Sequence, residues 1–247
     1  MSINLITGNE DAKRAVVNQW RMNKSSGTYL FYGKKGAYLK EFALAFAKGI
    51  NCNESVHDFC DKCRVCENIN KEIYSDLHII SASEGTVKID QIRELIKNAS
   101  ETSYEIGKKV FIIEDVNKLR KEASNALLKI IEEPPKDTYF ILLANSLNIL
   151  PTIKSRSLAI EIQKLTHEEL GVEESLYNFF LGDVKDIREF KSGAYTLSKE
   201  SYKNTAIYMK EYLETGEFLP KIRAYGALED FILEKSYLSE IDKIAFA

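Results

Sequence analysis

The sequence predicts an α/β protein, in which a mostly parallel sheet carries helices on both faces and is followed by a region made of helices alone. Strand-like and helix-like segments alternate up to about residue 164, and two of the strand-like runs, 110–113 and 139–144, are apolar throughout. Strands that are apolar on both faces are typical of parallel sheets covered by helices on each side. Beyond residue 165 no convincing strand pattern follows, so this part is predicted to be helical.

The elements of the first half follow in a regular order. They are a helix at Glu10–Met22, a strand at Thr28–Tyr32, a helix at Glu41–Ile50, a strand at Asp76–Ser81 and a helix at Gln91–Ser100. The second helix is apolar at Phe42, Ala45, Phe46 and Gly49, which share one face at helical spacing. Asp90 is predicted to cap the start of the helix Gln91–Ser100, because its carboxylate can accept a hydrogen bond from a free backbone N–H group.

The alternation continues in the second half of this part. Its elements are a strand at Lys109–Glu114, a helix at Ser124–Glu133, a strand at Tyr139–Ala144 and the segment Ile149–Ile162. The helix must end at Pro134-Pro135, since neither proline can donate a backbone hydrogen bond and the first disfavours helical backbone in the residue before it. Glu114 and Asp115 close the carboxyl end of their strand, where open parallel sheets place their chemistry.

A change to helices alone places the main domain boundary near Leu165. The helices expected beyond it are His167–Phe180, Asp183–Phe190, Ser198–Leu213 and Leu219–Leu238. The composition, with 45% hydrophobic and 29% charged residues and only 4 prolines, indicates a compact protein. Residues 1–164 carry 24 basic and 21 acidic side chains and the rest carry 10 and 16, so the net charge of -3 is unevenly spread.

Two features bear on location. No apolar run approaches the roughly 18 to 20 residues needed to span a bilayer. The N-terminus Met1–Asn4 lacks the basic and apolar segments of a signal peptide. We therefore expect a cytoplasmic protein without a membrane partner.

A glycine turn between the first predicted strand and the second helix has the frame of a phosphate-binding loop. In a working loop Gly33 would be followed by four residues and then Gly-Lys-Ser/Thr, in which the lysine reaches the outer phosphates and the hydroxyl holds magnesium. Those three positions are Tyr38, Leu39 and Lys40 here. We therefore expect no functional ATP site. A solvated charged rim is the simplest interpretation of the lysines in this turn, Lys34, Lys35 and Lys40. They could also attract an anion.

All four cysteines lie within 15 residues, at Cys52, Cys60, Cys63 and Cys66. Two overlapping Cys-x-x-Cys steps let tight turns present thiolates to one tetrahedral ion, which predicts a structural Zn²⁺ site in a module at about residues 50–70. Two disulfides or four unrelated thiols are the alternatives, and disulfides are disfavoured in a reducing cytosol. His57 could replace a ligand, but four thiolates already fill the site, so we interpret it as a solvent-facing loop residue. A closed site serves folding rather than catalysis.

Several motifs in order carry a family resemblance. They are the strand and turn at 28–36, the helix end at 46–52, the four-cysteine insert, Val-Phe-Ile-Ile-Glu-Asp at 110–115, Asn-Ala-Leu-Leu-Lys-Ile-Ile-Glu-Glu-Pro-Pro at 125–135, and Leu-Pro-Thr-Ile-Lys-Ser-Arg-Ser at 150–157. Together they resemble the clamp-loader branch of the AAA+ ATPases. Within it, the vacated loop is similar to delta-prime subunits of bacterial DNA polymerase III rather than to the ATP-hydrolysing gamma/tau subunits. The resemblance implies a degenerate AAA+ P-loop-type domain at 1–164, a helical lid at 165–195 and a short helical collar-like region at 196–247.

The resemblance also implies a role for Arg156. Family members carry a Ser-Arg-Cys motif whose arginine acts as an arginine finger in the nucleotide site of the adjacent subunit. This chain keeps Ser155 and Arg156 and has Ser157 in place of the cysteine; an ordinary surface salt bridge is the alternative. Active relatives end the strand in Asp-Glu, where this chain has Glu114-Asp115. We interpret this pair as an acidic strand end retained for local structure. The alternative is a working pair of a metal-binding acid and a catalytic base, in which the two side-chain lengths are exchanged.

The expected function is that of a non-hydrolysing clamp-loader subunit, which is not an enzyme by itself. The resemblance implies gamma/tau and delta subunits as partners, with Arg156 completing a neighbour's ATP site while the sliding clamp is placed on primer-template DNA. Two alternatives remain, namely an active AAA+ ATPase with a divergent site and a zinc-dependent protein-interaction module outside replication.

Overall fold

The computed structural model describes residues 2–34, 36–82, 86–101, 103–104, 107–172, 174, 177 and 182–192. The chain divides into two compact units, Met1–Leu165 and Thr166–Ala247. The first unit holds the sheet and all of the predicted site residues.

Five parallel strands form the sheet of the first unit, in the spatial order β2-β3-β4-β1-β5. Their bounds are β1 Gly27–Tyr32, β2 Leu77–Ile80, β3 Lys109–Ile113, β4 Thr138–Ala144 and β5 Leu158–Glu161. Every residue of β3 and β4 is buried, because helices cover both faces of the central strands. The predicted parallel sheet with helices on both faces is therefore confirmed.

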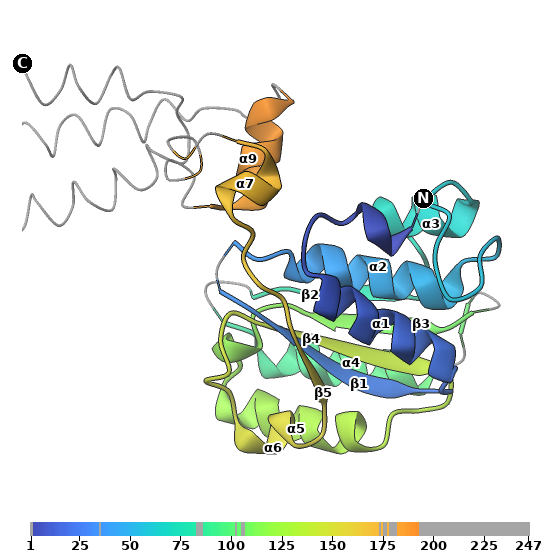
Figure 1. The fold of residues 1–247 in the computed structure, drawn as a ribbon. Helices are drawn as coiled ribbons and strands as arrows, with labels where there is room; N and C mark the ends of the chain where they lie inside the picture. The colour runs from blue at the N-terminus through green and yellow to red at the C-terminus, as the bar shows by residue number, and fades with distance from the viewer. Residues whose placement is uncertain are drawn as a thin grey trace, which may run out of the picture. The chain divides into compact units, whose positions relative to one another are not determined.

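One face of the sheet is covered by α1 (Glu10–Met22) and α2 (Leu39–Asn51) (Figure 1). The aromatic ring of Phe46 from α2 lies 4.6 Å from the Tyr29 ring of β1, measured between centroids, and 6.4 Å from the Trp20 ring of α1. Gly49 lets the two helices approach, since a Cβ atom there would lie 2.2 Å from Cε2 of Trp20. The sheet and this helix pair thus share an aromatic core.

The opposite face is covered by α4 (Ile89–Ser100), α5 (Lys121–Glu132) and the short α6 (Pro151–Lys154) (Figure 1). Their apolar side chains pack with those of β1, β3 and β4 into one core cluster. Thr28 of β1 donates a buried hydrogen bond of 2.8 Å from Oγ1 to the Ile131 carbonyl oxygen near the end of α5. The carboxyl end of α5 is therefore fixed to the sheet.

The first unit differs from the sequence prediction at the start of α4 and in short helices that the sequence did not predict. Helix α4 begins at Ile89 and not after Asp90, because the Gln91 side chain accepts a hydrogen bond of 2.9 Å from the Lys88 backbone N–H. Asp90 is therefore not the cap and lies in the first turn. A helix that the sequence did not predict, α3 (Arg64–Asn70), follows Cys63. Short 3-10 helices lie at Ile3–Leu5 and Val116–Lys118.

In the second unit, the predicted single helix from His167 to Phe180 is wrong. The helix α7 (His167–Leu170) ends because Gly171 is left-handed, at φ 60°, and the Val172 N–H donates to the His167 carbonyl oxygen at 3.0 Å. The helix α9 (Val184–Lys191) matches its prediction to within a residue. The helices predicted at 198–213 and 219–238, and with them the collar-like region at 196–247, lie outside the described residues. The division into lid and collar stays a prediction.

Within the part of the chain that the structure describes, no helix is both long enough and apolar enough to cross a membrane.

Candidate functional site

The glycine turn after β1 is packed tightly against the neighbouring strands. The Gly33 N–H donates to the Ala144 carbonyl oxygen at 3.1 Å, and a Cβ atom on Gly33 would lie 2.1 Å from the Ile162 carbonyl oxygen. The turn closes with a hydrogen bond of 2.9 Å from the Ala37 N–H to the Lys34 carbonyl oxygen. The frame of a phosphate-binding loop is thus present, with glycine required by the close approach of backbone. Lys35 lies outside the described residues.

The residues that follow the turn face the core and not a ligand. Tyr38 is 2% exposed and Leu39 is 8% exposed. A working loop has its phosphate-binding lysine at the Leu39 position. Here that position contributes an apolar side chain to the interior, so it offers no charge to a phosphate.

Lys40 is not the solvated rim residue that the sequence suggested. Its ammonium forms ion pairs with Glu72 at 2.8 Å and with Glu114 at 3.2 Å. Burial alone would lower the pKa of Lys40, but the hydrogen bonds and charges of the two carboxylates outweigh it and raise the pKa above its usual value. Lys40 therefore stays charged between two carboxylates. That expectation was wrong for Lys40, because these carboxylates come from segments that no local pattern connects to it.

The acidic pair at the end of β3 is engaged within the chain. Glu114 also accepts a hydrogen bond from the Ser81 hydroxyl. Asp115, which has left-handed backbone at φ 53°, pairs with the Lys118 ammonium at 2.9 Å and accepts a hydrogen bond of 3.0 Å from the Asn145 side-chain amide. Both acids thus have local partners, which fits an acidic strand end retained for structure.

Arg156 lies in the turn between α6 and β5. Its Nε donates to Oε2 of Glu132 at 2.8 Å, and its Nη1 donates to the Thr152 carbonyl oxygen at 3.1 Å. The side chain is 29% exposed, and the described residues contribute no hydrogen bond to Nη2. Ser157, which stands where the family has cysteine, donates from Oγ to the Ile153 carbonyl oxygen at 2.9 Å. The turn is therefore ordered, and part of the guanidinium remains accessible.

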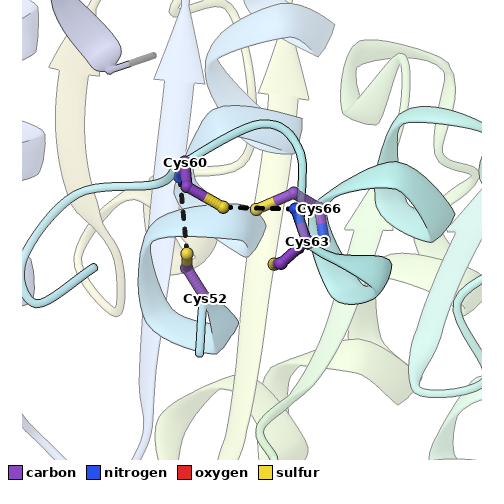
Figure 2. A group of neighbouring side chains, drawn as sticks. All are labelled: Cys52, Cys60, Cys63 and Cys66. Atoms are coloured by element: carbon purple, nitrogen blue, oxygen red, sulfur yellow. Dashed lines mark hydrogen bonds between the residues drawn. The ribbon is translucent and has the colours of Figure 1, made fainter. Parts of the chain in front are cut away.

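The four cysteines come together at the ends of α2 and α3, as Figure 2 shows. One sulfur atom from each lies within 4.8 Å of all the others, so Cys52, Cys60, Cys63 and Cys66 form a group that could hold a metal ion. Backbone N–H groups of Cys60, Cys63 and Cys66 donate to the sulfurs of Cys52, Cys60 and Cys63 at 3.4, 3.2 and 3.5 Å. His57 is exposed and lies outside this group.

The thiols differ in how easily they lose a proton. Hydrogen bonds from backbone N–H groups, first that of Lys62, lower the pKa of Cys60 to about 6, whereas burial raises the pKa of Cys52 and Cys66. Four thiols at this separation fit the soft, tetrahedral donor set that Zn²⁺ prefers. A metal would supply the positive charge that lets the buried thiols be thiolates together.

Ion pairing anchors the cysteine module, at about residues 50–70, to α2. The Lys48 ammonium pairs with Asp61 at 2.6 Å and lies 4.1 Å from the centre of the Phe59 ring. Asn70 donates to the same carboxylate at 2.9 Å. Glu72, which lies just beyond the module, pairs with Lys40 at the start of α2.

The first unit of the chain matches a family of known proteins. A family model described as DNA polymerase III, delta subunit, matches residues 8–166, which is more than half of the chain. The chain belongs to this clamp-loader family. Bacillus subtilis DNA polymerase III subunit delta-prime is 35% identical over 153 residues, which are 62% of this chain and 46% of that protein. DNA polymerase III subunit gamma of Buchnera aphidicola (subsp. Schizaphis graminum) is 32% identical over 209 residues, which are 84% of this chain and 54% of that protein.

A solved structure supports the family fold. The gamma subunit-related protein of Thermotoga maritima aligns with a TM-score of 0.54 at 20% identity, and the alignment covers 95% of this chain and 75% of that one. The predicted AAA+ clamp-loader fold is therefore confirmed for the sheet domain. The chain spans about half the length of the curated relatives it matches.

The sequence predicted the cysteine group, which the structure brings together. It also singled out Arg156 and Lys40, but it did not indicate their charged partners. Lys40 bonds to carboxylates 32 and 74 residues further along the chain, and Arg156 bonds to a carboxylate 24 residues before it. The one available signal was that Lys40 and Glu114 both follow carboxyl ends of strands in one parallel sheet. A clamp-loader motif identifies residues such as Arg156, but it does not predict which carboxylates they contact.

The anchor between α2 and the cysteine module yields a stability prediction for this clamp-loader chain. We expect Lys48→Ala to lower the free energy of unfolding by about 2 kcal/mol. The substitution leaves Asp61 without its ammonium and removes the contact with the Phe59 ring, while the partial exposure of Asp61, 22%, moderates the loss. Urea unfolding measures the change. The exposed Lys62→Ala in the same loop serves as the control and should stay within about 0.5 kcal/mol of wild type.

Proposed function

We propose that this chain is a delta-prime-like subunit of the DNA polymerase III clamp loader that hydrolyses no ATP itself and supplies Arg156 to the ATP site of a neighbouring gamma/tau subunit. In this role it assists the loading of the sliding clamp onto primed DNA. Sequence identity does not separate the two kinds of relative, since delta-prime and gamma proteins match at 35% and 32%. The residues of the vacated loop support the choice.

The ion pair between Lys40 and Glu114 is the observation that carries the proposal. Phosphoryl transfer needs a lysine on the phosphates, a hydroxyl and an acid on magnesium, and a group that orients the attacking water, all placed together. In this chain Leu39 is buried at the lysine position, and the ammonium of Lys40 neutralises the acid that would hold magnesium. The acid that would hold magnesium is thus already paired with a cation of the chain itself.

Arg156 supports the second half of the proposal. Its side chain is partly accessible in an ordered turn, and a permanently charged, planar guanidinium suits charge that develops on a γ-phosphate. The proposed partners are gamma/tau and delta subunits, and any direct contact with DNA would be made to phosphates. The cysteine group is proposed to hold one structural Zn²⁺ that stabilises the insert after α2.

Nucleotide binding by the isolated chain tests the non-hydrolysing part. We expect no binding of labelled ATP with Mg²⁺ at millimolar concentration and no turnover, while the gamma/tau subunit measured alongside binds and hydrolyses it. The chain should co-elute with gamma/tau and delta on gel filtration. Turnover by the chain alone would identify an active ATPase instead, and a failure to co-elute would point to an interaction module outside the clamp loader.

A further inference from the structure

Arg156 is held by a carboxylate that the motif does not name. Glu132 is the last residue of α5, and its Oε2 accepts the 2.8 Å hydrogen bond from Arg156 Nε. The Thr152 carbonyl oxygen accepts from Nη1. Because a guanidinium is planar, two contacts on different nitrogen atoms fix both the position and the plane of the group.

Both ends of this contact lie on segments that hydrogen bonds hold in place. The carboxyl end of α5 is fixed by the buried hydrogen bond from Thr28 to Ile131, one residue before Glu132. The turn of Arg156 is fixed by the hydrogen bond of 3.2 Å from its N–H to the carbonyl oxygen of Ile153, a residue that is 1% exposed. A carboxylate on such a support can set the place of an otherwise mobile arginine side chain.

Helix stability gives no reason for a glutamate at this position. The carboxyl end of a helix carries partial negative charge, so an acid there is unfavourable by a few tenths of a kcal/mol. The pair with Arg156 is also half exposed, with Glu132 at 54%, and such pairs contribute about 0–1 kcal/mol to folding. Removing the carboxylate should therefore leave the fold intact.

We propose that Glu132 is a positioning residue, which orients the Arg156 guanidinium so that its Nη2 end is presented to the neighbouring ATP site. The inference rests on the proposed function of Arg156. The contacts engage Nε and Nη1 within the chain, and the described residues leave Nη2 without a hydrogen bond. An arginine held in this way approaches the γ-phosphate already oriented, and it loses less rotamer freedom when it does so.

The experiment compares variants in a reconstituted complex of this chain with gamma/tau and delta. Glu132→Ala should lower the clamp- and DNA-stimulated kcat for ATP about tenfold at the site served by Arg156, with KM for ATP changed less than about twofold. Glu132→Gln keeps an acceptor for Nε and should recover most of the rate. Glu133→Ala removes the adjacent exposed carboxylate, which has no side-chain partner among the described residues, and should match wild type.

A double variant separates positioning from an independent effect. Arg156→Ala with Glu132→Ala should be no slower than Arg156→Ala alone, because Glu132 acts through the arginine. If Glu132→Ala equals wild type or is faster while Arg156→Ala is impaired, or if the double variant is slower than Arg156→Ala, the positioning role is overturned and the proposed function stands. Full activity of Arg156→Ala would instead overturn the proposed function.

Assembly is checked by gel filtration and folding by thermal unfolding. If the Glu132→Ala complex fails to assemble, Glu132→Asp serves as the test variant. This substitution keeps the negative charge but shortens the side chain by one methylene group, which moves the carboxylate away from Arg156. A lowered kcat at unchanged KM in the assembled Glu132→Asp complex supports the role, and a wild-type rate rejects it.

Discussion

Arg156→Ala lowers ATP hydrolysis at the one gamma/tau site that this chain is proposed to complete by roughly 10³-fold, the lower end of the range for an arginine finger supplied by a partner. The physical reason is that alanine removes a fixed positive charge from the place where negative charge develops on the γ-phosphate. The total ATP hydrolysis rate of the reconstituted complex is measured as phosphate release with clamp and primed DNA. It should fall by the fraction that this one site contributes. Binding of ATP by gamma/tau should change little.

Two further variants test whether the effect is specific to the guanidinium of Arg156. Arg156→Lys keeps a charge but not the planar fork, so its rate should lie between those of Arg156→Ala and wild type. Arg120→Ala removes an exposed arginine at the start of α5 and should leave the rate unchanged. An unchanged rate in Arg156→Ala complexes of normal composition would contradict the finger role.

Loss of the Zn²⁺ proposed for the cysteine group should have the largest effect on stability. We expect metal analysis after gel filtration to give about one Zn²⁺ per chain and Cys66→Ser to abolish it, because Cys66 is buried in α3 and would supply one of the four proposed sulfur ligands. A metal present at about 1,000 times its dissociation constant stabilises the folded state by about 4 kcal/mol. The urea midpoint of Cys66→Ser should fall accordingly.

The control for this experiment is His57→Ala. His57 is exposed and lies outside the cysteine group, so this variant should keep both its metal and its stability. Full metal content in Cys66→Ser, or equal stability of wild type with and without a strong chelator, would contradict a structural metal site.

Much of the fold could be predicted because its signals are local. The runs that became β3 and β4 are apolar at nearly every position, and Pro134 ends α5 wherever the tertiary contacts lie. The errors occurred at helix ends, where the contacts or the backbone of a single residue decide the boundary. Gln91 accepts from the Lys88 N–H and moves the start of α4, and Gly171 ends α7 through its left-handed backbone. The helix α3 has only seven residues, too few to show a period.

In the candidate site, too, the features that are local in sequence could be predicted and the contacts between distant segments could not. The cysteine group could be predicted because its members are neighbours in sequence, with the last three at a spacing of three residues. The partners of Lys40 and Arg156 could not, since they depend on which strands lie side by side and on where a distant helix ends. An ammonium between Glu72 and Glu114 is a property of the assembled sheet and its insert.

The contacts of Lys40 would make the proposed loss of ATP binding hard to reverse. A lysine introduced at Leu39 would place its stem in the apolar interior, and the resident ammonium would still neutralise Glu114. Replacing Lys40 alone would leave Glu72 and Glu114 without their shared cation and without a lysine to bind phosphate. Because each single step is unfavourable on its own, ATP binding would require several changes at once, and under the proposed function such a chain would keep its dependence on a neighbouring subunit.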